Sequence, residues 1–178
     1  MTFLSQFLLF FLLIFISGMG SNWAAGTDEI RAPFGFSWGE SMGKIETILL
    51  ATKARIVDRE KLRDGERLQV EGIAQPNLVA AFFVFRSGGL SEVELQYADS
   101  LWSKEQYSAY FDRMKRSLEE RHGTSQLIAR MRSMQNEILH TLVGYQWIKQ
   151  NTSLQIFLFQ AEKGTESFRR LSLHYRCH

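Results

Sequence analysis

The feature that most constrains this 178-residue chain is a hairpin pattern between residues 77 and 97. Two strand-like runs meet at Gly88-Gly89, where glycine adopts positive φ angles without a steric cost. The second run alternates strictly, with Val93, Leu95 and Tyr97 on one face and polar residues between them. This alternation predicts a strand with one packed face and one wet face.

The first run of this hairpin, Leu78 to Phe85, is apolar on both faces. A two-residue turn at the glycines pairs Val84 with Val93 and turns Phe83 and Phe85 away from the packed face. One extra loop residue turns the same two phenylalanines toward the core. The sequence therefore leaves open whether these two phenylalanines are core residues or contact residues.

The C-terminal part of the chain repeats this pattern. The matched segments are residues 82–85 (FFVF) with 156–159 (IFLF), and residues 93–97 (VELQY) with 171–175 (LSLHY). A helix pattern that follows a tryptophan precedes each hairpin. We interpret the chain as two helix-then-strands repeats, at about residues 34–98 and 99–178, and chance similarity between two amphipathic hairpins is the alternative.

Two helices are predicted from apolar spacing and from end signals. Ser41 is suited to cap a short helix over residues 42–51. A longer helix begins with the capping box Ser103-x-x-Gln106 and ends before Gly123. Its apolar stripe consists of Tyr107, Tyr110, Phe111, Met114 and Leu118.

The predicted fold class is α+β. Strand patterns cover residues 52–58 and 66–73, and residues 124–140 fit both a helix period and a strand period, of which we favour strand with loop. The simplest architecture is one antiparallel sheet backed by two helices. Low proline content and the absence of low-complexity tracts predict a single domain over residues 26–178.

The first 27 residues carry no charge and contain an apolar block, Phe7 to Ile16. This block is shorter than the about 20 residues that cross a bilayer, but it suits a signal peptide over residues 1–25. We expect cleavage near Ser21 or Gly26, and a periplasmic or secreted protein without a further integral membrane segment. Because no Lys or Arg precedes the block, an uncleaved N-terminal anchor in the inner membrane is the alternative.

The charges of the chain nearly cancel, with 21 basic and 19 acidic side chains. No strong field therefore draws the protein to nucleic acid or to anionic membranes. Cys177 is the only cysteine, so no disulfide forms within the chain. It lies near His174 and His178, but strand alternation directs Cys177 and His174 to opposite faces, and we expect neither a metal nor a cofactor.

One segment matches a catalytic motif. Residues 35–39 read G-F-S-W-G, the pattern of a nucleophile elbow, in which Ser37 would use His140 or His174 as its base. An elbow requires a buried strand directly before it, whereas Pro33 occupies this place. A small serine hydrolase is therefore kept as an alternative function.

The order of short motifs resembles small exported bacterial proteins of uncharacterised function. The residues that carry this resemblance are Phe36, Trp38, Gly39 and Ser41 (F-x-W-G-x-S), Phe83 and Phe85 (F-x-F), and residues 121–123 (R-H-G). The doubled plan is similar to the β-lactamase inhibitor protein fold, a scaffold that binds other proteins on its sheet. The resemblance implies a fold and a binding role, and it transfers no catalytic residues.

The expected function is that of a non-enzymatic binding module for another envelope or secreted protein, or for an envelope component. The expected contact residues are Phe83, Phe85, Phe157 and Phe159, because aromatic side chains in excess of core needs are typical of binding surfaces. A carrier that holds a small apolar ligand between helices and sheet is a further alternative.

Overall fold

The computed structural model describes residues 29–178, so the predicted signal peptide and cleavage points lie outside the described residues. A short 3-10 turn, η1 (Pro33–Gly35), comes first. The elements that follow are α1 (Met42–Ala51), β1 (Arg55–Leu62), β2 (Gly65–Glu71), β3 (Leu78–Arg86), β4 (Gly89–Tyr97), α2 (Lys104–His122), β5 (Gln126–Gln135), β6 (Ile138–Lys149), β7 (Thr152–Lys163) and β8 (Glu166–Cys177). In this part of the chain, neither helix has the length and apolar character needed to cross a membrane.

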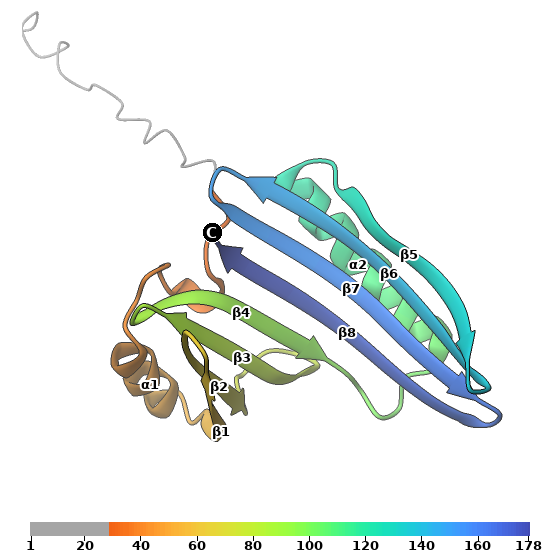
Figure 1. The fold of residues 1–178 in the computed structure, drawn as a ribbon, viewed down its shortest axis with the longest axis horizontal. Helices are drawn as coiled ribbons and strands as arrows, with labels where there is room; N and C mark the ends of the chain where they lie inside the picture. Colours follow the sequence, from red (N-terminus) through yellow and green to blue (C-terminus); the bar gives the residue numbers. More distant parts are fainter. Residues whose placement is uncertain (1–28) are drawn as a thin grey trace, which may run out of the picture.

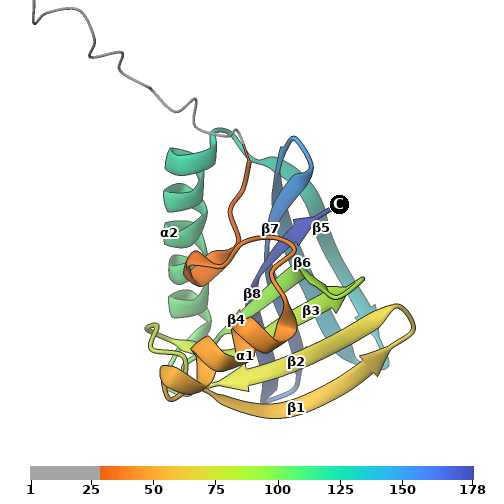
Figure 2. The same ribbon diagram turned by 90° about the vertical axis from the view of Figure 1, so that its left-hand side faces the viewer.

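The eight strands of residues 29–178 form one antiparallel sheet in the order β1-β2-β3-β4-β8-β7-β6-β5 (Figure 1). The predicted α+β architecture, an antiparallel sheet backed by helices, is confirmed. Each helix precedes four strands, and the last strands of the two sets, β4 and β8, pair at the centre with Leu95 opposite Leu173. The sheet twists strongly, so β1 and β2 cross the direction of the other half steeply (Figure 2).

Both helices pack on the same face of the sheet. Ile45 and Leu49 of α1 and Phe111 of α2 belong to one core cluster with inward residues of both halves of the sheet, such as Phe83 and Ile156. Burying each such side chain contributes about 1.5–3 kcal/mol, so this shared core joins the two halves. We call the opposite face, which neither helix covers, the open face.

The long helix has the predicted end signals. The Ser103 hydroxyl accepts a hydrogen bond from the Gln106 amide at 3.3 Å, and the Gln106 side chain accepts one from the Ser103 amide at 2.7 Å. The rings of Trp102 and Tyr107 meet edge to face at 5.0 Å, as a hydrophobic staple requires. The capping box and the staple together determine where α2 begins.

The N-terminal segment is held by the sheet. Ser41 is the residue before α1, but its side chain makes no capping hydrogen bond, so the predicted side-chain cap is wrong. Instead, Ser41 forms a β-bridge with Gly89 at the start of β4. A Cβ at Gly89 would lie 2.8 Å from the Cα of Gly39, so this close approach requires glycine.

The register of the first hairpin decides where its phenylalanines lie. The turn is formed by Ser87 and Gly88, which have φ angles of 50° and 81°. Ser91 is an extra, unpaired residue of β4, and its hydroxyl donates to the Val84 carbonyl at 3.1 Å. This bulge turns Phe83 and Phe85 into the core, where they are 0% and 3% exposed. The register with both phenylalanines on the open side is therefore not the one adopted.

The ambiguous stretch between residues 124 and 140 forms strands. β5 ends at Gln135, and a two-residue turn of Asn136 and Glu137, with φ angles of 49° and 65°, leads into β6. This result confirms the interpretation of the segment as strand with loop. β5 is the outer strand at one end of the sheet (Figure 1).

Candidate binding surface on the open face

The four phenylalanines expected to make contacts lie on opposite faces of the sheet. Phe83 and Phe85 are buried against the helices, whereas Phe157 and Phe159 of β7 are half-buried on the open face. The ring of Phe157 covers Gly144, since a Cβ at Gly144 would lie 2.5 Å from it. Only the second pair is therefore placed to meet a partner across the open face.

Further aromatic side chains adjoin this pair. The ring of Phe159 lies 5.9 Å from that of His140 and 6.1 Å from that of Phe168. The guanidinium of Arg170 lies over the Phe168 ring at 5.2 Å. We call Phe157, Phe159 and Phe168 the aromatic patch, which extends along β7 and β8.

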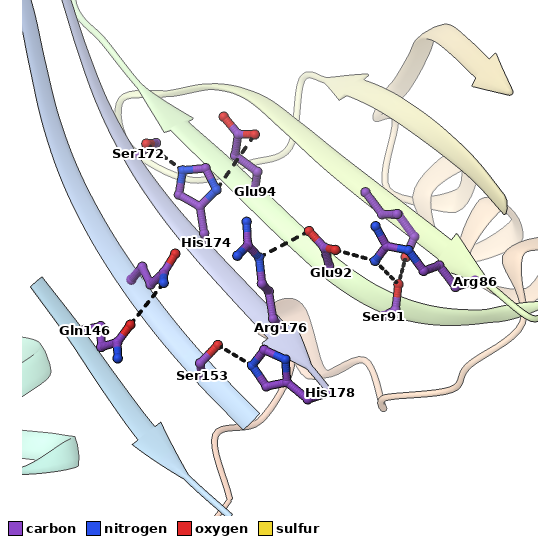
Figure 3. Close-up of polar contacts among 12 residues, drawn as sticks. Arg86, Ser91, Glu92, Glu94, Gln146, Ser153, Ser172, His174, Arg176 and His178 are labelled. Atoms are coloured by element: carbon purple, nitrogen blue, oxygen red, sulfur yellow. Dashed lines mark hydrogen bonds and ion pairs between the residues drawn. The ribbon is translucent and has the colours of Figure 1, made fainter. Parts of the chain in front are cut away.

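A charged cluster of Arg86, Glu92, Glu94, His174 and Arg176 lies on β3, β4 and β8 (Figure 3). It adjoins the aromatic patch where the ring of His174 meets that of Phe157. Glu92 of β4 forms ion pairs with Arg86 of β3 and with Nε of Arg176 of β8, the latter at 3.3 Å. The hydrogen bond from Arg86 to Glu92 raises the pKa of that arginine, and Asp64 binds its Nε at 3.0 Å. Glu92 is thus a structural carboxylate that joins three strands.

The second part of the charged cluster is built around His174. Its Nε2 lies 2.9 Å from the Ser172 hydroxyl, and its Nδ1 lies 3.9 Å from a carboxylate oxygen of Glu94. Burial lowers the pKa of His174, Glu94 opposes this effect, and the positive charge of Arg176 adds to it. The imidazole is therefore neutral at neutral pH, and its ring edge meets Phe157 at 5.3 Å between centroids.

The order serine, histidine, carboxylate is also that of the triad of serine hydrolases, but the geometry differs from it. The 3.9 Å separation between His174 and Glu94 is too long for a hydrogen bond. Ser172 is 5% exposed, and β8 is paired at this residue with both neighbouring strands, so the ladders use the surrounding backbone amides. The contact with Ser172 orients His174 within the open face.

The residues of the hydrolase alternative are not brought together. Phe36, next to Ser37, packs against Phe83 on the helix side of the sheet, with ring centroids 5.8 Å apart. His140 and His174 lie on the open face, as their contacts with Phe159 and Phe157 show. The sheet therefore separates Ser37 from both candidate bases.

Two further candidate sites from the sequence were a metal site near His178 and a cavity for a small apolar ligand. His178 Nε2 lies 3.0 Å from the Ser153 hydroxyl, and within residues 29–178 no three His, Cys, Asp or Glu side chains form a group that could hold a metal. Two hollows of ≈ 420 and ≈ 340 Å³ lie between the N-terminal segment and α2. Arg121 lines both hollows, together with apolar residues such as Leu118 and Tyr175.

The charged cluster was not predicted as a site from the sequence. Glu92, Glu94, His174 and Arg176 do alternate with apolar residues, which indicates one wet face for each strand. Their proximity depends on the pairing of β4 with β8, and these strands are distant in the sequence. Comparisons with protein-family models, curated proteins and solved structures gave no match to this chain.

Proposed function

We propose that this protein is an exported, non-enzymatic module that binds another protein or an envelope component through the open face of its sheet. The observation that carries the proposal is that helices cover one face, while the other presents the aromatic patch beside the charged cluster. Aromatic side chains and arginine are the residue types enriched at protein interfaces. Export is part of the proposal because of the apolar block in residues 1–25.

The packing of the aromatic patch supports a role in recognition. Phe157 is held between Gly144 and His174, and Phe159 lies between His140 and Phe168. Because these rings already pack against neighbouring residues, a partner that contacts them loses less side-chain entropy than it would on fully exposed rings. The charges of the cluster then contribute more to the choice of partner and to the rate of association than to the affinity.

We also propose that the scaffold arose as two copies of one helix-and-four-strands unit. The matched segments 93–97 and 171–175 pair with each other in antiparallel orientation, with their middle residues, Leu95 and Leu173, directly opposite. Two copies of a unit related by a two-fold axis would pair in this way. In such a scaffold the open face is continuous across both copies.

The test is affinity capture from an envelope extract with the purified protein as bait. We expect the wild type to retain a partner that the double variant Phe157→Ser/Phe159→Ser does not retain. The matched control, Leu50→Ser/Leu101→Ser, removes two exposed apolar side chains outside the open face and should retain the partner. Equal capture by the Phe157→Ser/Phe159→Ser variant would contradict the proposal.

A further inference from the structure

The two outer strands of the sheet, β1 and β5, differ in how they are protected (Figure 1). An edge strand presents unpaired backbone N–H and C=O groups, to which another strand can add. Proteins block such addition with short strands, charges and bulges. The protection of each edge therefore indicates whether a further strand is excluded or accepted.

The β1 edge carries these protective devices. A register shift at Val57 interrupts the pairing of β1 with β2. The arginines of β1 are neutralised within the fold, since Arg55 pairs with Glu71 at 3.4 Å and Arg59 pairs with Glu46 at 2.5 Å. Another strand would have to displace or match this ordered set of charges.

The β5 edge carries fewer protective devices than the β1 edge. Nine of its ten residues are exposed, among them the large apolar side chains Leu127, Ile128, Met131 and Met134. Its register shift lies near the start of the strand, before Ala129, and the rest pairs regularly with β6. Its two charged residues are Arg130 and Arg132, and among residues 29–178 neither has an ion-pair partner.

The register assigns these side chains to faces. Arg130 lies opposite Val143 of β6, which packs on the core, so Arg130 and Arg132 lie on the helix side of the sheet. Met131 lies opposite Leu142 and therefore faces the open side. The edge thus presents two positive charges two residues apart, with an apolar side chain between them on the other face.

A second copy of this chain fits this edge poorly. Antiparallel pairing of β5 with β5 would bring Arg130 and Arg132 of two copies together, and like charges across strands are destabilising. Head-to-tail addition of β1 would face the same two arginines with Lys61 and with Arg59, which is already paired with Glu46 and shares the helix side with Leu68. Neither mode of self-association therefore supplies an acidic partner to Arg130 and Arg132.

We propose that β5 accepts an extended segment of a different protein as a ninth strand, with acidic side chains two residues apart opposite Arg130 and Arg132. Backbone hydrogen bonds would supply most of the affinity of such strand addition. The two cross-strand ion pairs would select the register, and an apolar residue between the acids would contact Met131. This inference does not depend on the proposed role of the open face.

The test uses a synthetic peptide of alternating Glu and Val, as long as β5, at low ionic strength. Fluorescence anisotropy should show binding to the wild type and at least about tenfold weaker binding to Arg130→Glu/Arg132→Glu. The matched control, Lys61→Glu/Arg63→Glu, changes the net charge equally and should bind as the wild type does. Hydrogen exchange should show protection of amides in residues 126–135 when the peptide is bound.

A second peptide separates strand addition from charge attraction. N-methylation of every peptide residue removes the backbone donors along both edges of the peptide but keeps the glutamates, so this peptide should not bind. Equal binding of both peptides would overturn the proposal, as would no binding of the first up to about 1 mM. A dimer of the protein alone that protects the amides of residues 126–135 would assign the edge to a second copy, and would also overturn it.

Discussion

The hairpins β3–β4 and β7–β8 have similar sequences but use their phenylalanines differently. In each, the first strand is apolar on both faces and the connecting turn has two residues. Phe83 and Phe85 are core residues, whereas Phe157 and Phe159 lie on the open face. The strand pairing explains the difference, because the bulge at Ser91 shifts β3–β4, while β7 and β8 pair without a shift.

This comparison teaches that register, more than residue type, selects the core. In β7 the inward positions are filled by Leu154, Ile156 and Leu158, so the two phenylalanines of that strand are not needed for packing. In β3 the phenylalanines themselves fill the space under α1 and the N-terminal segment, and Phe83 contacts the ring of Phe36. The matched segments thus place their phenylalanines in the core in one half and on the open face in the other.

The largest expected effect comes from truncating one phenylalanine in each hairpin. Phe83→Ala should lower the free energy of unfolding by about 3–5 kcal/mol, because it leaves a cavity in the closed core. Phe157→Ala should cost about 1 kcal/mol or less, because solvent reaches that site. Urea unfolding of both variants measures the difference, and similar losses would show that both rings are core residues.

A smaller effect is expected when a methyl group is added to a glycine in the strand beside β3 or beside β7, the two strands that carry the phenylalanines. A Cβ at Gly65 would lie 1.9 Å from the Phe85 carbonyl oxygen, a backbone atom that cannot move freely. Gly65→Ala should therefore cost about 1–3 kcal/mol, whereas in Gly144→Ala the Phe157 ring can swing away on the open face. Thermal unfolding should rank the wild type above Gly144→Ala and Gly144→Ala above Gly65→Ala.

The matched control for these two variants is Gly43→Ala in α1, where a Cβ would meet nothing within 4 Å. This substitution should leave stability unchanged or raise it by up to about 1 kcal/mol, since alanine favours the helix. A loss for Gly144→Ala as large as that for Gly65→Ala would mean that Phe157 is fixed as tightly as the core.

The smallest expected effect is on the pH dependence of stability. The pKa of His174 is lowered by burial, and Arg176 adds to this effect against Glu94 and Glu92. His174 therefore binds a proton more readily in the unfolded chain than in the folded protein. The free energy of unfolding should be highest above about pH 6.5 and should fall as the pH drops below this value. The change should appear in urea midpoints, and His174→Gln should make the profile flatter.

A second histidine serves as the comparison for this profile. The pKa of His122 is also lowered, first by burial and then by the charges of Arg121 and Lys149. His122→Gln should flatten the profile as well, but it should leave the contacts of Phe157 on the open face unchanged. A wild-type stability that rises on acidification would contradict the environment described for both histidines.

The helices and the fold class could be predicted because their signals are local. The capping box at Ser103 and the apolar stripe of α2 lie within one short stretch, and Gly123 ends the helix with a φ angle of 85°. The strand nature of residues 126–135 was harder to predict, because β5 is exposed on both faces and has no burial period. The side chains of an edge strand carry little information about its structure.

The candidate site was only partly predictable. The outward position of Phe157 and Phe159 follows from the alternation of β8, which pairs regularly with β7. The inward position of Phe83 and Phe85 depends on one unpaired residue, Ser91, and a serine there has no feature that marks a bulge. The cluster around His174 requires contacts between strands that no local pattern specifies.

The central position of β8 has a consequence for synthesis. β8 lies between β4 and β7, although the ribosome makes it after the other seven strands. A nascent chain that has reached Gly164 can form β1–β4 and β5–β7 only as separate sheets, in which β4 and β7 are temporary edges. The two sheets can join only after β8 has been made, when Leu95 pairs with Leu173. This pairing closes a long loop and therefore carries an entropic cost. A chaperone that covers these two edges until then would protect the chain from aggregation.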